Sequence, residues 1–392
     1  MRTISAATCL PQDLSSALLV GRVWRNGSIN GPCVVVVREG QVFDITATIP
    51  TTADLLDRHD LPGYVRTLEG EPLGSAEALV QATLDGTPGA PQLLAPCDVQ
   101  AIKACGVTFA ASLLERVIEE QAGGKPERAA TLRAELMETI GSDLSRIKPG
   151  SEQAEQLKQA LQARGAWSQY MEVGLGPYAE VFSKAQPMSA VGMAADVGLH
   201  PASQWNNPEP EIVLAVNSRL EAVGATLGND VNLRDIEGRS ALLLGKAKDN
   251  NASCAVGPFI RLFDDSFGID HVRQAEVKLA IEGEDGFVLE GASHMRQISR
   301  DPLDLLQQTA GAHHQYPDGF MLFMGTMFAP IQDRGAPGAG FTHKLGDRVT
   351  ISTLALGALV NHVQRSDQLP PWTFGVRALY QSLARRQLKW EA

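Results

Sequence analysis

The alternation of hydrophobic and polar residues predicts strands near the start of the chain. Residues 18–25 alternate loosely between the two classes, and residues 34–37 are a run of valines, whose β-branched side chains favour strands. Glu39-Gly40 offers a turn, and residues 42–46 return to a strand-like pattern. This succession is typical of a β-hairpin.

Two short helices and a linker are expected next. The helices are predicted over residues 53–57 and 75–84, and the Gly-Pro-rich stretch 86–91 separates them from the rest of the chain. We therefore predict a small β-rich N-terminal domain over residues 1–90, followed by a larger domain over residues 91–392.

The middle of the chain has the periodicity of amphipathic helices. Hydrophobic residues recur at helical spacing in residues 112–120, and residues 126–144 and 151–163 repeat the pattern. Together they predict a helical insertion at about residues 112–165. Residues 165–198 are rich in Gly, Pro, Ala and Met without clear periodicity, which predicts loops with short strands.

The remainder is mostly β, interrupted by two helices. One helix is expected over residues 303–308, where Asp301 and Pro302 suit the N-cap and the first turn, and the other over residues 376–388. Helices grouped before strands predict an α+β fold rather than an alternating parallel sheet. Three hairpins are predicted, over residues 212–216 with 222–226, 275–281 with 287–290, and 348–352 with 358–363.

Composition narrows the function classes. The 392 residues carry 34 Lys and Arg against 45 Asp and Glu, a formal net charge of −11, so we expect no nucleic-acid partner. No apolar run is long enough to span a membrane and no secretory signal is recognised, so we expect no membrane partner. The five cysteines are widely spaced without a C-x-x-C pair, which favours reduced thiols in a cytoplasmic protein. Neither a Rossmann fingerprint nor a P-loop occurs.

Two acidic residues at the mouth of a predicted strand are the most informative feature. Glu209 and Glu211 are two positions apart, so in a strand their side chains share a face. We expect the following hairpin to place Thr226 opposite Glu211 and Gly228 opposite Glu209. This register brings Asp230 beside the same strand end, and the sequence thus predicts three converging carboxylates.

A converging trio of carboxylates needs a compensating charge. At short range, repulsion would leave at least one of the three groups protonated near neutral pH, whereas a divalent cation resolves the repulsion. Ligation by oxygen alone favours Mg²⁺, with Mn²⁺ or Ca²⁺ as substitutes, over zinc or copper. The alternative interpretation is a solvated acidic turn without a metal.

The motifs around these residues resemble the fumarylacetoacetate hydrolase superfamily. The E-x-E pair is followed by an N-D-x-x-x-R-D motif that starts at Asn229, and Lys248 precedes Gly257-Pro258. The resemblance covers roughly residues 100–365. Each motif alone is weak evidence for the family, and the specificity comes from the order in which the motifs occur. The later matches are P-D-G at 317–319, G-T at 325–326, G-D at 346–347 and L-G-A-L-V-N at 356–361.

This resemblance implies a mixed β-sandwich roll that binds a metal, forms a homodimer or homotetramer and acts on a small 2-oxo sugar acid. Glu209, Glu211 and Asp230 match the family's metal ligands. Lys248 matches the active-site lysine, because its distance to the Gly-Pro pair fits better than that of Lys246. The residues that we assign to substrate binding are Thr326, which matches a threonine that contacts the substrate carboxylate, and Arg234, Glu237 and Lys246.

One departure from the family pattern changes the expected reaction. Hydrolytic members carry G-x-N-Y-x-x-H-x-x-E, whose His-Glu pair activates water, and the matching segment starts at Gly106. Glu115 is retained, but Ser112 stands at the histidine position, and a serine cannot take a proton from water near pH 7. This replacement, and the helices inserted before Trp167, resemble the branch of 2-keto-3-deoxypentonate (xylonate or arabinonate) dehydratases.

The expected reaction is therefore the metal-dependent dehydration of a 2-keto-3-deoxypentonate to 2,5-dioxopentanoate (α-ketoglutarate semialdehyde) in oxidative pentose catabolism. Lys248 is the expected base at C3, unless it only neutralises the acidic cluster. Glu115 is the expected acid for the C4 hydroxyl, through a water held by Ser112, unless it lies on the helix surface. Two other classes stay open: a C–C hydrolase or decarboxylase of an acylpyruvate-like 2,4-dioxo acid, and a catalytically silent sugar-acid binder.

Overall fold

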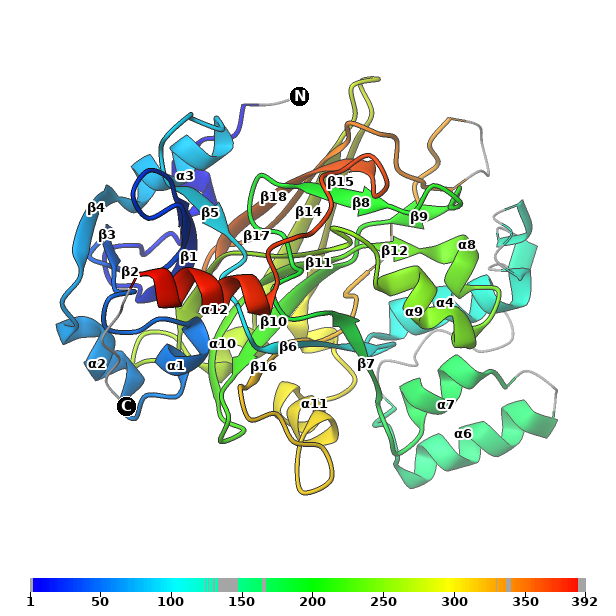
Figure 1. Ribbon diagram of the computed structural model, residues 1–392. Helices are drawn as coiled ribbons and strands as arrows, with labels where there is room; N and C mark the ends of the chain where they lie inside the picture. Colours follow the sequence, from blue (N-terminus) through cyan, green and yellow to red (C-terminus); the bar gives the residue numbers. More distant parts are fainter. Residues whose placement is uncertain are drawn as a thin grey trace.

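The computed structural model describes residues 3–123, 125, 127–129, 131–132, 147–163, 167–328, 330–335 and 340–386. Two β-sheets occupy its centre, with helices gathered at both ends (Figure 1). The α+β class predicted from the sequence is confirmed. Along the described residues, no helix is both long and apolar enough to cross a membrane.

The larger sheet has eleven strands in the order β4-β3-β2-β1-β13-β11-β10-β16-β6-β7, with β5 paired to β1. Its central strands β10, β11, β13 and β16 are almost entirely buried, which explains their continuous hydrophobic runs. The strands are β1 (Leu19–Arg25), β2 (Gly31–Arg38), β3 (Gln41–Asp44), β4 (Glu71–Ser75), β5 (Gln92–Leu94), β6 (Ala101–Gly106), β7 (Glu180–Ala185), β10 (Pro210–Val216), β11 (Ala222–Asp230), β13 (Cys254–Leu262) and β16 (Phe320–Phe323).

The second sheet has five strands in the order β15-β14-β17-β18-β8 and shares one hydrophobic core with the larger sheet. All three predicted hairpins are confirmed, as β10 with β11, β14 with β15, and β17 with β18. The strands are β8 (Asp196–Leu199), β14 (Glu276–Glu282), β15 (Val288–His294), β17 (Arg348–Thr353) and β18 (Gly357–Arg365), and a separate short pair joins β9 (Asn206–Asn207) to β12 (Asn232–Leu233).

Helices α4 and α6 to α9 lie together at one end of the sheets, at the right in Figure 1. The helices are α1 (Thr52–Leu56), α2 (Leu61–Thr67), α3 (Ala76–Leu84), α4 (Ala110–Ala122), α6 (Glu152–Ala163), α7 (Gln169–Leu175), α8 (Arg234–Glu237), α9 (Leu244–Lys248), α10 (Ile269–Arg273), α11 (Pro302–Thr309) and α12 (Val376–Arg385). The described residues also form the 3-10 turns η1 (Ala6–Cys9), η3 (Ala241–Leu243) and η4 (Met295–Gln297).

Side-chain caps start several helices where the sequence predicts them. Ser75 Oγ accepts from the amide of Ala78, and Asp301 accepts from that of Leu303. The prediction of loops over residues 165–198 is wrong in one part, because Ser168 caps the helix α7. Most of the predicted helix over residues 126–144, and the end of that over 376–388, lie outside the described residues.

The first 90 residues are not set apart from the rest of the fold, so the predicted small N-terminal domain is not confirmed. Strand β1 pairs with β13, with Leu19 opposite Arg261, and so continues the central sheet. The carboxylate of Asp98, beyond the predicted linker, accepts from the amide of Thr52 at 2.6 Å and so anchors the start of α1. The two segments therefore fold around shared strands and a shared core.

Candidate active site

Two neighbouring strands bring the three predicted carboxylates together. Glu209 directly precedes β10, Glu211 lies within it, and Asp230 ends β11. The predicted register is wrong by two residues: Glu211 lies opposite Gly228, and the amide of Asp230 donates to the carbonyl of Glu209 at 3.0 Å. Val216 pairs with Ala222, one residue later than that register implies, and a bulge between Ala215 and Val216 shifts the pairing by one residue more. The shift places Asp230 nearer to Glu209 than expected.

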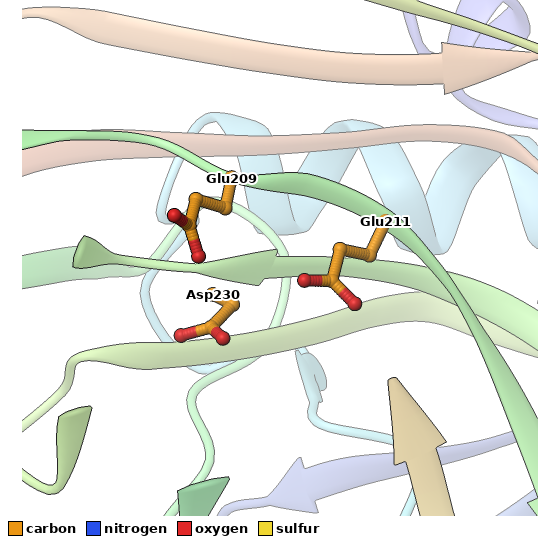
Figure 2. Close-up of side chains that lie close together, drawn as sticks. All are labelled: Glu209, Glu211 and Asp230. Atoms are coloured by element: carbon orange, nitrogen blue, oxygen red, sulfur yellow. The ribbon is translucent and has the colours of Figure 1, made fainter. Parts of the chain in front are cut away.

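The three carboxylates form a compact buried group. Glu209, Glu211 and Asp230 each offer an oxygen within 4.8 Å of the others, and each residue is at most 2% exposed. Figure 2 shows the side chains pointing toward one another from the two strands. A solvated acidic turn would expose these groups, so the burial argues against that alternative.

Protonation compensates part of the charge of this trio. Burial, with the neighbouring charges of Asp230 and Glu209, raises the pKa of Glu211 well above its ordinary value. Burial also acts to raise the pKa of Glu209, but Lys248 and Arg116 outweigh it and lower that pKa to about 2. Burial and neighbouring charge therefore favour the protonated form of Glu211, whereas they leave Glu209 ionised.

Three buried cations surround the trio. Lys248 Nζ, on α9, lies 2.6 Å from Glu209 Oε2 and 3.1 Å from Asp230 Oδ2. Arg116, on α4, pairs with the other carboxylate oxygen of Glu209. Lys184 Nζ, on β7, lies 2.8 Å from Asp230 Oδ1. The sequence singled out only Lys248, because β7 and α4 approach the carboxylates through tertiary packing that no local pattern records.

A small cavity of about 10 Å³, room for about one water molecule, lies at this cluster. A sugar acid is larger than one water, so its binding requires the surrounding side chains to move. Among the residues assigned from the sequence, those that line the cavity are Ser112, Glu209, Asp230, Glu237, Lys248 and Thr326, and further lining residues include Cys105, Arg116, Glu180 and Phe182.

Other residues assigned from the sequence lie beside the cavity or away from it. Glu115 accepts from Arg234 at 3.0 Å, and Arg234 also donates to Glu119 at 2.6 Å while its guanidinium stacks on Trp205. Neither Glu115 nor Arg234 belongs to the described cavity wall, which differs from the expectation. Lys246 is exposed on α9, whereas Lys248 points into the core.

Ser112 and the Gly325-Thr326 turn shape opposite parts of the site. The Ser112 hydroxyl donates to the carbonyl of Phe109 at 2.8 Å, within its own helix. Gly325 has a φ of 99°, which only glycine adopts readily, and its amide donates to Glu211 Oε2 at 2.7 Å. Thr326 Oγ1 lies 3.4 Å from Glu211 Oε1, so this turn orients the carboxylate of Glu211.

Two further carboxyls face the cavity. Glu180 starts β7, and no described residue forms a hydrogen bond or an ion pair with its carboxyl. Its partner in the sheet is Gly106, where a Cβ would come within 1.9 Å of Glu180 Oε2, so the carboxyl packs directly over the glycine. Burial raises the pKa of Glu180, and burial raises that of Glu237 to about 7. Glu237 can therefore hold a proton near neutral pH, and burial favours the protonated form of Glu180.

Replacement of Lys184 by Met is expected to destabilise the protein more in EDTA than in saturating Mg²⁺. Without Lys184, Asp230 keeps a buried charge with one fewer partner, and breaking such a pair costs about 3 kcal/mol in the free energy of unfolding. A cation held by Asp230 would offset part of that cost. Urea unfolding with and without Mg²⁺ measures the difference.

A control for this prediction is Lys103→Met, on the neighbouring strand β6, where the ammonium group donates to Ser183. Its effect should be small and independent of Mg²⁺. An equal loss for Lys184→Met in both conditions would show that Lys184 acts only through its hydrogen bonds to the carbonyls of Val231 and Lys248.

Comparison with known proteins adds two curated relatives, whereas no family model matches the chain. A protein named probable 2-keto-3-deoxyxylonate dehydratase, from Haloferax volcanii, is 30% identical over 194 residues, which are 50% of this chain and 63% of that protein. The 2-dehydro-3-deoxy-D-arabinonate dehydratase of Saccharolobus solfataricus is 29% identical over 186 residues, 47% of this chain and 59% of that protein. The chain thus matches less than two thirds of the length of either relative.

Solved structures share the fold over most of the chain. A 2-keto-3-deoxy-D-arabinonate dehydratase complexed with magnesium and 2,5-dioxopentanoate has a TM-score of 0.61 and 20% identity, over 89% of this chain and 99% of that one. The fumarylacetoacetate hydrolase of Exiguobacterium antarcticum has a TM-score of 0.52 and 17% identity, over 89% and 100%. The chain therefore has the fold of the fumarylacetoacetate hydrolase superfamily, as its motifs indicate, and is similar in sequence to 2-keto-3-deoxypentonate dehydratases.

Proposed function

We propose that the protein is a Mg²⁺-dependent dehydratase of a 2-keto-3-deoxypentonate, with 2,5-dioxopentanoate and water as products. The observation that carries the proposal is the buried trio Glu209, Glu211 and Asp230 facing Lys248, with Ser112 where hydrolases carry histidine. The sequence similarity to two dehydratases of this substrate class supports it.

The residues present fit a hard divalent cation. Three buried carboxylates within 4.8 Å of one another provide the oxygen donors that Mg²⁺ prefers, and without a metal ion burial and their mutual repulsion raise the pKa of Glu211. Glu209, Glu211 and Asp230 would hold Mg²⁺, with Mn²⁺ or Ca²⁺ as candidate substitutes. When bound, the ion supplies polarisation of the 2-oxo group, which acidifies the protons on C3.

Lys248 is the proposed base that removes a proton from C3. Burial acts to lower the pKa of Lys248, but the carboxylates of Asp230 and Glu209 outweigh it and raise the pKa. A cation on the same two carboxylates would reduce their attraction for the lysine, and the effect of burial would then prevail. Lys248 is thus suited to accept the proton only in the metal-loaded protein.

Glu180 is the proposed acid that protonates the C4 hydroxyl as the C4–O bond breaks and water leaves. It lines the cavity, lacks a described partner, and its pKa is raised by burial. The sequence favoured Glu115 for this step, but the ion pair with Arg234 holds Glu115 beside the cavity. Loss of the C3 proton and the C4 hydroxyl leaves a C3=C4 alkene. Transfer of a proton from C5 to C3 gives the C4=C5 enol, and movement of its hydroxyl proton to C4 then yields 2,5-dioxopentanoate.

The product profile tests this function directly. We expect the purified protein with Mg²⁺ to convert 2-keto-3-deoxyxylonate or 2-keto-3-deoxyarabinonate to 2,5-dioxopentanoate, detected as a semialdehyde adduct by mass spectrometry. An acylpyruvate should not be cleaved, because Ser112 cannot activate water. Efficient C–C cleavage of a 2,4-dioxo acid without dehydration would refute the dehydratase proposal and favour the hydrolase alternative.

Ser112→His gives a second arm of the same test. The variant places an imidazole four residues before Arg116 on the cavity-facing side of α4, and it restores the hydrolytic His-Glu pattern with Glu115. Slow acylpyruvate cleavage together with slower dehydration is expected. The wild-type protein, assayed under the same conditions, is the control.

Two properties of the whole protein are also proposed. All five cysteines are free and buried, which supports a cytoplasmic location with reduced thiols. A homodimer or homotetramer, implied by the family resemblance, stays a prediction that sedimentation can test.

A further inference from the structure

The charged cluster around the cavity contains more carboxylates than cations. Every cation that faces the cavity therefore matters for binding an anion. The described members are Glu115, Glu119, Glu180, Glu209, Glu211, Asp230 and Glu237, against Arg116, Lys184, Arg234 and Lys248.

Two cations, Arg116 and Lys248, are among the described residues that line the cavity. Lys248 contacts two of the three carboxylates and is the proposed base. Lys184 is fully buried between Asp230 and backbone carbonyls. Arg116 is therefore the cavity-lining cation that has no other role in the proposed reaction.

Arg116 is held through one guanidinium nitrogen and presents the other to the site. Nη1 lies 2.7 Å from Glu119 Oε2 and 3.1 Å from Glu237 Oε2, and neither residue belongs to the trio. Nη2 donates to Oε1 of Glu209, whose Oε2 accepts from Lys248. Each oxygen of Glu209 thus faces a cation, and a metal ion held by Glu209 would compete with Arg116 and Lys248 for its lone pairs.

We propose that Nη2 of Arg116, released from Glu209, binds the C1 carboxylate of the 2-oxo acid and makes the site selective for anionic substrates; the inference rests on the proposed function. The contacts of Nη1 with Glu119 and Glu237 remain, so the guanidinium keeps its position while Nη2 changes partner. A guanidinium pairs with a carboxylate through directed, charge-assisted hydrogen bonds, which suits it to this role.

The test separates metal binding from anion binding. Arg116→Met removes the charge and keeps a side chain of similar length, and Arg116→Lys keeps the charge. Calorimetry measures Mg²⁺ affinity first and then the affinity of the Mg²⁺-loaded protein for oxalate, a non-reacting analogue of a 2-oxo acid. For Arg116→Met we expect Mg²⁺ affinity equal to or higher than in the wild type, because a competing cation is gone. Oxalate affinity should fall about 10- to 100-fold, with Arg116→Lys in between.

Arg22→Met is the matched control, because Arg22 is also a buried arginine but donates to the carbonyls of Ala95 and Cys97 beside β1. It should leave oxalate affinity unchanged. Unchanged oxalate affinity in Arg116→Met, or a parallel loss of Mg²⁺ and oxalate binding with a lower melting temperature, would overturn the inference. If the wild type nevertheless converts its substrate, either of these results refutes only the role of Arg116 and leaves the proposed function standing. If the wild type binds no oxalate and converts no 2-oxo acid, the proposed function fails, and the inference with it.

Discussion

Replacing Glu209 with Gln, or Asp230 with Asn, is expected to abolish Mg²⁺ binding and dehydration while the far-UV circular dichroism spectrum stays that of the wild type. Each change removes one of three hard anionic ligands, so Mg²⁺ affinity should fall by orders of magnitude. The amides have nearly the same shape as the carboxylates and keep the packing of β10 and β11. Calorimetric titration with Mg²⁺ and the semialdehyde assay measure the two losses.

Glu211→Gln separates metal loss from fold loss most sharply. Since burial and its neighbours raise the pKa of Glu211, the metal-free protein favours the neutral form of this residue, and glutamine resembles that neutral form. The melting temperature in EDTA should therefore stay at the wild-type value or rise. The increase that Mg²⁺ causes in the wild type should disappear.

Glu77→Gln, on the exposed side of α3, is the control for a lost carboxylate away from the site, and it should keep the Mg²⁺-induced increase. Turnover that persists in EDTA and in Glu209→Gln would contradict the assignment of the trio as a metal site.

The carboxylate trio could be predicted because its information is local. The two-residue spacing of Glu209 and Glu211 fixes a shared strand face, and a single hairpin returns Asp230 to it. The register was still wrong by two residues, since the pattern of apolar residues fixes neither the pairing at the turn nor the bulge between Ala215 and Val216. The site could still be predicted, because a register shift of two residues keeps Asp230 on the same face of the sheet as Glu209 and Glu211.

The partners of the trio could not be predicted because they come from distant elements. Arg116 and Lys184 reach the carboxylates from α4 and β7, and each looks like an ordinary polar residue of its own helix or strand. Glu180 is recognisable only once β6 places Gly106 opposite it. The sequence distinguished Lys248 from Lys246 by its motif, and burial gives the physical difference, since one is in the core and the other is exposed. Strand β13 was missed because its fully buried run lacks the alternation that marks a half-exposed strand.

Glu180→Gln is expected to slow dehydration about 10²- to 10⁴-fold while exchange of the C3 protons with solvent deuterium persists. The amide cannot donate a proton to the departing C4 hydroxyl with the acidity of a carboxyl group, whereas removal of the C3 proton rests on Lys248. Lys248→Met should abolish both exchange and dehydration. Proton NMR in deuterium oxide follows the loss of the C3 signal and the appearance of product in one experiment.

The Glu115→Gln variant decides between the two candidates for the general acid: Glu115, which the sequence motif indicates, and Glu180, which lines the cavity. Since Glu115 is bound to Arg234 beside the cavity, we expect its replacement to slow dehydration much less than that of Glu180. Thermal unfolding provides the control, because loss of the Arg234 partner should lower the stability of Glu115→Gln whether or not it acts in catalysis. The opposite result would be a 10²- to 10⁴-fold loss of dehydration in Glu115→Gln, with C3 exchange at the wild-type rate, and near-normal turnover in Glu180→Gln. That result would assign the acid role to Glu115, which would then have to reach the substrate through a water beside Ser112.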